Sequence, residues 1–160
     1  MSVYALIMPP PPSDFDPTRA AGCACFALRK AARALTQVYD EALRPAGIRA
    51  TQLSLLMVVH AAGPIAVSRL AELMVTDRTT MSRNLKPLDS DGLLRIRRGG
   101  DRRVHEVSLT RRGRELVKRA FPLWEQVQER TRAMLGDERL QRMLGDLAVT
   151  VEAADVVDPA

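Results

Sequence analysis

The sequence predicts a mainly α-helical chain with one two-stranded β-hairpin, on the strength of three observations. Apolar residues recur at three- and four-residue steps along most of the chain, which is the spacing of a buried helix face. Aromatic residues make up only 4% of the 160 residues, which favours packed helices over a β-sandwich. Between residues 93 and 109 the pattern changes to alternation around Gly99-Gly100-Asp101, which is typical of a hairpin with a tight turn.

The helices are expected in a definite order around this hairpin. They span residues 23–43, 52–62, 68–74, 77–90, 110–135 and 138–154, with a short strand or extended piece at 65–67. The expected N-caps are Thr51 for the second helix, Thr76 or Asp77 for the fourth, and Thr110 for the fifth. A short helix, a tight turn, a polar-faced helix and a basic hairpin, in this order, form a winged helix-turn-helix.

This order divides the chain into three kinds of segment. Residues 1–20, which include four consecutive prolines, are expected to be a flexible arm. Residues 21–155 are expected to form one domain, with a winged helix-turn-helix core at 48–110 and dimerisation helices at 21–46 and 111–155. These flanking helices carry more apolar stripes than one small core can cover, so an isologous homodimer is expected. The alternative is that the helices pack within a single chain.

Positive charge is concentrated in the middle of the chain. The formal net charge is +5 and the isoelectric point about 9.9. Residues 69–119 alone hold 14 Lys and Arg against 7 Asp and Glu, so the rest of the chain is slightly acidic. Such an asymmetric basic region predicts a polyanionic partner, and the predicted fold makes double-stranded DNA the first candidate.

The predicted helix 77–90 has one apolar side and one side that suits a DNA groove. Met81, Leu85 and Leu88 fall within about 60° of one another on a helical wheel and are expected to face the core. The opposite side combines small hydroxyls with long cations, which suit the major groove. The DNA-binding residues expected on this helix are Arg78, Thr79, Thr80, Ser82, Arg83, Lys86 and Ser90. The alternative is an ordinary solvated helix face.

Arginines crowd the hairpin and its tip, where Arg95 and Arg97 precede the residues expected to touch DNA. Those residues are Arg98, Asp101, Arg102 and Arg103. The functional interpretation places the tip in a minor groove, whose negative potential attracts arginine. Asp101 would then hold Arg103 in one rotamer through a charge-assisted hydrogen bond. A basic hairpin without this role is the alternative.

Together, these motifs resemble the MarR (multiple antibiotic resistance regulator) family. The resemblance rests on four motifs and covers roughly residues 23–155: Leu70-Ala71-Glu72, Asp77-Arg78-Thr79-Thr80-Met81-Ser82-Arg83, Leu88-x-x-x-Gly92-Leu93 and Asp101-Arg102-Arg103 followed by Leu109-Thr110. It implies a homodimer whose first and last helices intertwine, a recognition helix at 77–90, and Asp101 and Arg103 as paired wing residues. It also implies release of DNA when a small phenolic or other aromatic acid, an oxidant or a metal binds.

Two further sets of residues are candidates for effector sensing. By the same resemblance, an effector pocket lies between the dimer helices and the winged core, and Tyr39, Met57, His60 and Trp124 are proposed to line it. Cys23 and Cys25 are a candidate thiol sensor. However, side chains two residues apart on a helix point about 200° from each other, so small packing residues at the dimer interface are the alternative.

No catalytic chemistry is expected. The sequence contains no nucleophile elbow, phosphate loop or paired-carboxylate motif, and His60 and His105 lack partners at metal-ligand spacing. We therefore expect no enzyme activity, no cofactor and no metal site. No apolar run is long enough to cross a membrane and no secretory signal is evident, so a cytoplasmic location is expected.

The expected function is a sequence-specific transcriptional regulator, a repressor that a small molecule releases from DNA. A winged-helix protein–protein interaction module and a ligand-independent architectural DNA-binding protein are the alternatives. Salt-sensitive binding to duplex DNA would separate the first of these from the regulator.

Overall fold

The computed structural model describes residues 22–99 and 104–154. The chain divides into two compact units, Met1–Leu35 and Thr36–Ala160. The described part of the first unit contains the beginning of helix α1 (Ala24–Leu43), where every side chain up to Leu35 is exposed. The second unit contains the end of α1 and all the elements that follow.

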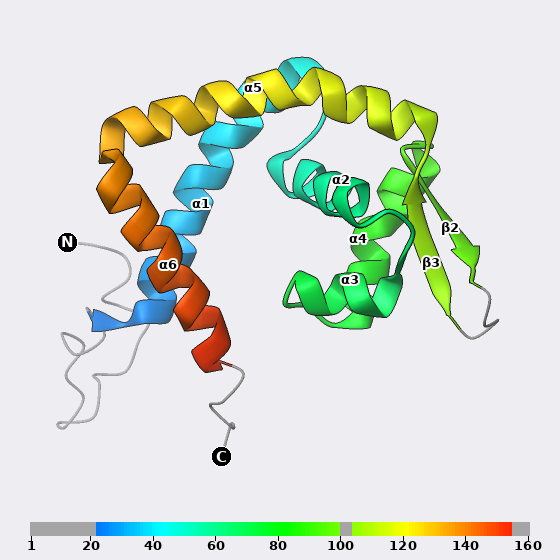
Figure 1. Ribbon diagram of the computed structural model, residues 1–160, viewed down its shortest axis with the longest axis horizontal. Helices are drawn as coiled ribbons and strands as arrows, with labels where there is room; N and C mark the ends of the chain where they lie inside the picture. Colours follow the sequence, from blue (N-terminus) through cyan, green and yellow to red (C-terminus); the bar gives the residue numbers. More distant parts are fainter. Residues whose placement is uncertain (1–21, 100–103, 155–160) are drawn as a thin grey trace, which may run out of the picture. The chain divides into compact units, whose positions relative to one another are not determined.

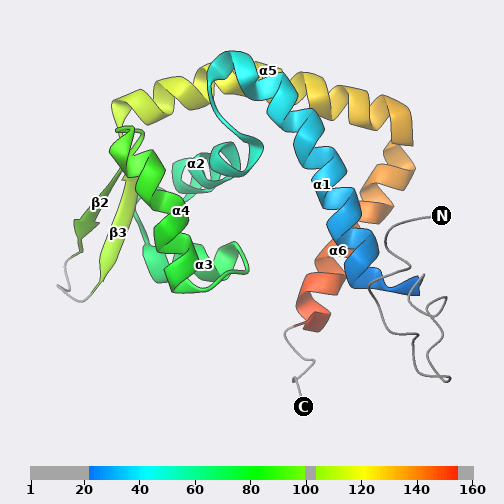
Figure 2. The same ribbon diagram turned by 180° about the vertical axis from the view of Figure 1, so that it is seen from behind.

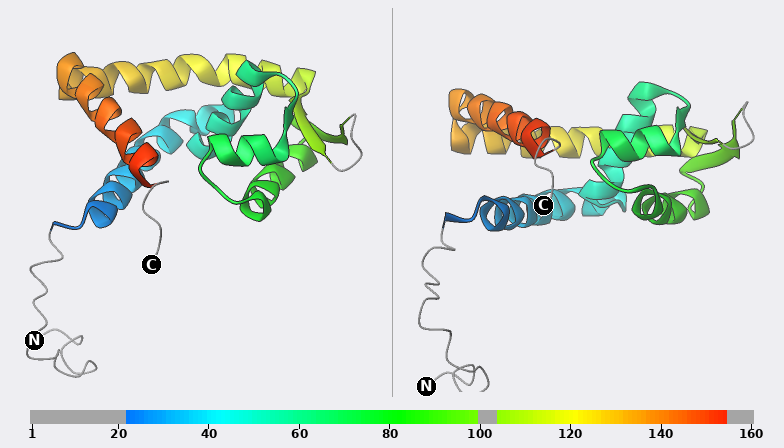
Figure 3. Two further views of the ribbon diagram at one scale, coloured as in Figure 1. Left: turned by 60° about the horizontal axis from the view of Figure 1, so that its bottom comes forward. Right: turned by 90° about the horizontal axis from the view of Figure 1, so that it is seen from below.

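The second unit is mainly helical, as predicted (Figure 1). Its elements after α1 are η3 (Arg44–Ala46), α2 (Ala50–Ala62), β1 (Ile65–Ala66), α3 (Val67–Leu73), α4 (Arg78–Ser90), β2 (Leu94–Arg98), β3 (His105–Leu109), α5 (Arg111–Leu135) and α6 (Asp137–Ala154). Helices α2, α3 and α4 pack together, and the hairpin β2–β3 projects from them (Figures 2 and 3). Helix α4 runs through Pro87 without interruption.

The sheet has three strands: the two strands of the predicted hairpin and a short strand at Ile65–Ala66, where a strand or extended piece was expected. The strand order is β1-β3-β2, and both pairings are antiparallel. Ile65 and Ile96 lie on either side of Val107 in the register. Strand β1 has only two residues, which is too short for alternation to appear in the sequence.

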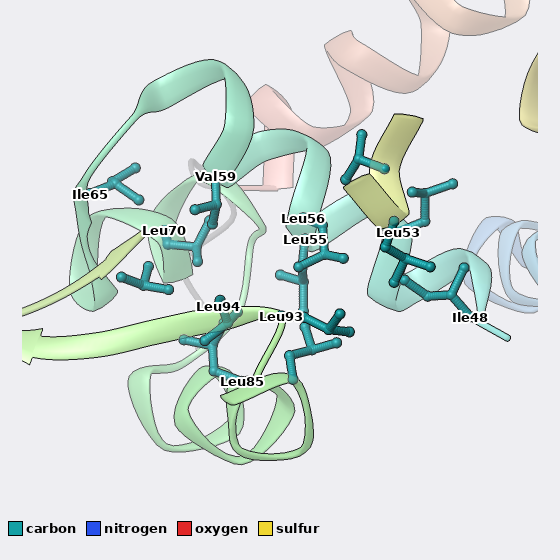
Figure 4. Close-up of a cluster of buried hydrophobic side chains, with 14 of the residues drawn as sticks. Ile48, Leu53, Leu55, Leu56, Val59, Ile65, Leu70, Leu85, Leu93 and Leu94 are labelled. Atoms are coloured by element: carbon teal, nitrogen blue, oxygen red, sulfur yellow. The ribbon is translucent and has the colours of Figure 1, made fainter. Parts of the chain in front are cut away.

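The core lies between α2, α3, α4 and the hairpin (Figure 4). Helix α2 is apolar nearly all round and buries Leu53, Leu55, Leu56 and Val59. From α4, Met81, Leu85 and Leu88 enter the same core, each no more than 1% exposed. Leu94 and Val107 close it from the sheet, so α4 and the hairpin are fixed to one another through shared apolar contacts.

The caps explain where the helices begin. Asp77 and Thr110 are the N-caps of α4 and α5, as predicted. Thr51 is not a cap, because α2 begins one residue earlier, at Ala50. Asp40, ten residues upstream, accepts a hydrogen bond from the Ala50 N–H at 2.7 Å. The Arg49 N–H donates locally to the Gln52 side chain at 3.1 Å, so the start of α2 combines a local contact with a tertiary one that a local pattern does not reveal.

Helix α5 starts directly on the hairpin and approaches it very closely. The Thr110 hydroxyl donates to the carbonyl of Gly92 at 2.7 Å and accepts from the Gly113 N–H at 3.0 Å. A Cβ atom placed on Gly113 would lie 1.9 Å from the Leu93 carbonyl oxygen. Only glycine allows this approach, so the base of the hairpin and the first turn of α5 form one rigid joint.

The turn between α3 and α4 contains a strained residue. Helix α3 ends with the Val75 N–H bonded to the Glu72 carbonyl and the Thr76 N–H bonded to the Ala71 carbonyl, both at 3.0 Å. This is the Schellman motif, whose left-handed position is normally glycine. Here Val75 adopts φ 49° and is 64% exposed. A β-branched residue in this conformation costs free energy.

Candidate nucleic-acid interface

Helix α4 is held at its start by a charged cap. The Asp77 carboxylate accepts hydrogen bonds from the Thr80 N–H at 2.9 Å and from the Thr80 hydroxyl at 2.6 Å. The hydrogen bond from the Thr80 side chain, followed by that from its backbone N–H, lowers the pKa of Asp77 below its ordinary value. An ionised Asp77 also faces the positive end of the helix dipole. The beginning of α4 is therefore well defined.

The outward side of α4 carries a surface that can enter a DNA groove. Thr79, Arg83, Lys86 and Ser90 are all exposed and lie opposite the buried apolar residues of the same helix. Among the described residues, Arg83 and Lys86 take part in no ion pair. Both cations are therefore available to bases or phosphates, and an arginine can bond a guanine edge through two N–H groups.

Two predicted contacts on α4 are already engaged within the helix. Thr80, which is partly buried, donates its hydroxyl hydrogen to Asp77. Ser82 donates its hydroxyl hydrogen to the Arg78 carbonyl at 2.8 Å. Neither hydroxyl can donate to DNA without breaking these bonds, although both keep lone pairs that accept. Their roles as DNA-binding residues stay predictions.

Asn84 is a candidate that the sequence reasoning missed. It is exposed and lines a cavity of about 650 Å³ together with Arg83, Gln52 and Val75. An asparagine amide can pair with the edge of adenine. On a helical wheel Asn84 falls about 60° from Met81, at the edge of the apolar side, which is why the pattern hides it. The signal in the sequence that could have revealed Asn84 was a polar residue at the edge of the apolar side of the helix.

The described part of the wing presents cations on both of its faces. Arg98 is exposed and pairs with His105 in the register, on the face that also carries Ile96. This face lies beside α4, where Arg78 and Ser82 join Ile96 and His105 around a cavity of about 240 Å³. Arg95 and Arg97 lie on the opposite face, by the alternation of the strand. Asp101, Arg102 and Arg103 lie outside the described residues.

The two larger cavities of the described residues do not include the proposed effector residues in their linings. Tyr39, Met57 and Trp124 are partly buried and pack against the core, whereas His60 is exposed. The cavities of about 650 and 760 Å³ are lined by other residues. Trp124 instead stacks on Phe121, with 5.4 Å between the ring centroids. The assignment of an effector pocket to these four residues stays a prediction.

The two cysteines are both exposed and free. Cys25 lies in the first turn of α1, and Cys23 precedes the helix. The thiol-sensor interpretation stays a prediction. In the parts of the chain that the structure describes, no group of three His, Cys, Asp or Glu side chains could hold a metal ion. No helix in those parts is long and apolar enough to cross a membrane.

Helices α3 and α4 followed by the hairpin β2–β3 define a winged helix-turn-helix protein. The model of the MarR family matches residues 46–104. The transcriptional regulator MosR of M. tuberculosis, whose structure was solved with DNA, is 41% identical, with a TM-score of 0.74 over 82% of this chain and 98% of that one. The chain therefore belongs to the MarR family, whose members are DNA-binding transcriptional regulators and not enzymes.

Two further proteins are similar to this chain, one of them in fold alone. A mutant of MarR from E. coli, solved in complex with operator DNA, shares the fold at 19% identity, with a TM-score of 0.76 over 85% of this chain and 99% of that one. The HTH-type transcriptional regulator YwoH of Bacillus subtilis (strain 168) is 27% identical over 84 residues. That match spans 52% of this chain and 61% of YwoH.

Proposed function

We propose that this protein is a homodimeric repressor that acts in the cytoplasm by binding a pseudopalindromic operator in double-stranded DNA. The observation that carries the proposal is the outward side of α4, where Thr79, Arg83 and Lys86 are exposed opposite three buried apolar side chains. The cations have no ionic partners among the described residues, and the adjacent hairpin adds further arginines. The DNA-bound structure of MosR, the relative at 41% identity, supports this choice of partner.

Exposed apolar side chains support a second copy of the chain as partner. On α5 and α6 they include Phe121, Met134, Leu144, Leu147 and Val151, from 36% to 76% exposed. An isologous dimer would cover such stripes. Its two-fold symmetry requires two operator half-sites about one helical turn of DNA, roughly 34–36 Å, apart. We assign the dimerisation helices to residues 21–46 and 111–155 and the DNA-binding core to 48–110.

A small aromatic or phenolic acid is the proposed effector. Tyr39, Met57 and Trp124 offer partly buried apolar surface, and His60 offers a polar group. Hydroxybenzoic acids are suitable probes: stabilisation of the protein by such a compound, together with loss of operator binding, would support the assignment. An unchanged melting temperature with the whole series would favour the alternative of an architectural protein without an effector.

The central test is DNA selection from a genomic library, followed by fluorescence anisotropy on the selected duplex. We expect Arg83→Ala to weaken binding by about 1–3 kcal/mol and to relax discrimination at one base pair of each half-site, because one bidentate contact to a base is lost. The control is Arg139→Ala, which removes an exposed arginine from α6. Equal affinities of Arg83→Ala and wild type would exclude α4 as the recognition helix.

A further inference from the structure

The outer face of the wing carries a second basic cluster, separate from the recognition helix. Arg95 and Arg97 of β2 and Arg111 and Arg114 of α5 line one cavity of about 310 Å³, together with Ser108 and Thr110. We name these four arginines the outer-wing cluster. Arg95 and Arg97 lie on the sheet face opposite Ile96 and His105, which face α4. Figure 1 shows that β2, β3 and the beginning of α5 meet at one corner of the second unit.

Among the residues that the structure describes, no acidic group lines the cavity of the outer-wing cluster, although one carboxylate lies beside it. The residues around the cavity include no carboxylate, and in the described parts of the chain none of the four arginines belongs to an ion pair. Glu106, the register partner of Arg97, is the carboxylate beside the cluster, and it is exposed. Arg114 donates a hydrogen bond to the Leu109 carbonyl at 2.9 Å, which fixes its position without neutralising its charge.

The beginning of α5 adds to the positive potential. Its first turn contains Arg111, Arg112 and Arg114 and no acidic residue. Cations at this end of a helix oppose the helix dipole and destabilise the folded chain. Arginines at the start of a helix depart from the usual preference for acidic residues there, and such a departure is typical of functional positions. A bound anion would relieve both the repulsion among the arginines and the unfavourable dipole.

The chemistry of the cluster indicates a phosphate. Guanidinium groups match phosphate oxygens through paired N–H donors, and a helix N-terminus is suited to the same anion. A hairpin that lies beside a helix in the major groove has phosphates on both of its sides. From this geometry we propose that the outer-wing cluster binds backbone phosphates of the duplex beyond the wing, on the side away from α4. This inference rests on the proposed DNA binding and extends its footprint.

The test compares Arg95→Gln/Arg111→Gln with wild type on the selected operator. Both side chains are exposed, and neither makes a hydrogen bond or ion pair among the described residues, so the variant is expected to fold. The plot of log Kd against log salt should lose about 0.9 of its slope for each phosphate contact removed. The ratio of variant to wild-type Kd would then grow about eightfold per contact as salt falls from about 1 M to about 0.1 M.

Two further readouts identify the phosphate that is bound. When the outermost base pairs are removed stepwise, affinity should fall for wild type but not for the variant. Base-pair discrimination should be the same in both proteins, because phosphates carry no sequence information. The control Arg119→Gln/Arg130→Gln removes two exposed arginines of α5 outside the cavity and should keep the wild-type slope and length dependence.

The outcomes separate this inference from the proposed function. A wild type that binds no duplex overturns both. A wild type that binds its operator, with the same salt slope and length dependence in the variant, overturns only the outer-wing phosphate contact. Thermal stabilisation of wild type but not of the variant by inorganic phosphate, with an unchanged salt slope on DNA, also overturns the DNA assignment and identifies a free anion instead.

Discussion

Gly113 is a single residue on which the joint between the hairpin and α5 depends. An added methyl group would lie 1.9 Å from the Leu93 carbonyl oxygen, which belongs to the backbone and cannot rotate away. We expect Gly113→Ala to lower the free energy of unfolding by about 1–3 kcal/mol, as overpacking does elsewhere. Urea denaturation measures the loss. The neighbouring exposed position provides the control, because Arg112→Ala should stay within about 0.5 kcal/mol of wild type.

A Gly113→Ala protein as stable as wild type would show that α5 can slide along the hairpin without penalty. The Thr110 hydroxyl bond to Gly92 would then have to lengthen, since both contacts belong to the same joint.

Val75 is a residue where substitution should stabilise the protein. Its left-handed backbone costs about 1–2 kcal/mol for an ordinary side chain, whereas asparagine tolerates this conformation. Because Val75 is 64% exposed, little apolar burial is lost on replacement. We expect Val75→Asn to raise the free energy of unfolding by about 0.5–1 kcal/mol. Val75→Ile keeps the β-branch and the strain and should leave stability unchanged; a gain in that variant would contradict the strain argument.

At the scale of elements, the start of α4 should respond to pH through Asp77. Because hydrogen bonds from Thr80 lower its pKa in the folded state, the cap stabilises the protein above the ordinary value of 3.8. That contribution is lost as pH falls through the lowered folded-state value. We expect the stability advantage of wild type over Asp77→Ala to be constant near neutral pH and to shrink in this acid range.

The matched control for the cap is Asp77→Asn, which keeps a capping oxygen but cannot titrate. Its advantage over Asp77→Ala should not depend on pH. Native-state hydrogen exchange at the first turn of α4 provides a local readout besides global unfolding. An advantage of wild type over Asp77→Ala that persisted below the lowered pKa would contradict the role of the charge.

Most elements could be predicted because their signals are local. Apolar periodicity located α4 and α5, and the caps Asp77 and Thr110 fixed where they begin. Where a tertiary contact contributes, the sequence pattern was less precise: it placed the start of α2 two residues too late and did not reveal the contact of Asp40 with the Ala50 N–H. In the candidate site, the wheel identified Arg83 but could not reveal that the hydroxyl of Ser82 is engaged by its own helix.

At the scale of the whole molecule, the proposed dimer depends on the outer helices. Leu144, Leu147 and Val151 follow one another at helical spacing on α6 and are 49%, 36% and 45% exposed. We expect Leu147→Arg to convert a dimer into a monomer of 17.7 kDa, because a buried unpaired charge opposes association. Analytical ultracentrifugation measures the mass. Asp146→Arg, on another side of the same helix, should remain dimeric, and a dimeric Leu147→Arg would remove α6 from the interface.

The continuity of α5 has a mechanical consequence. Its first turn is joined to the wing through Thr110 and Gly113. The helix therefore acts as a lever that carries the wing at its N-terminal end. Its 25 residues span about 37 Å at roughly 1.5 Å per residue. A tilt of about 5° about the far end would displace the wing by about 3 Å, comparable with the reach of a hydrogen bond to DNA. A conformational change near Leu135 would thus weaken the contact of the wing with DNA without altering the outward side of α4.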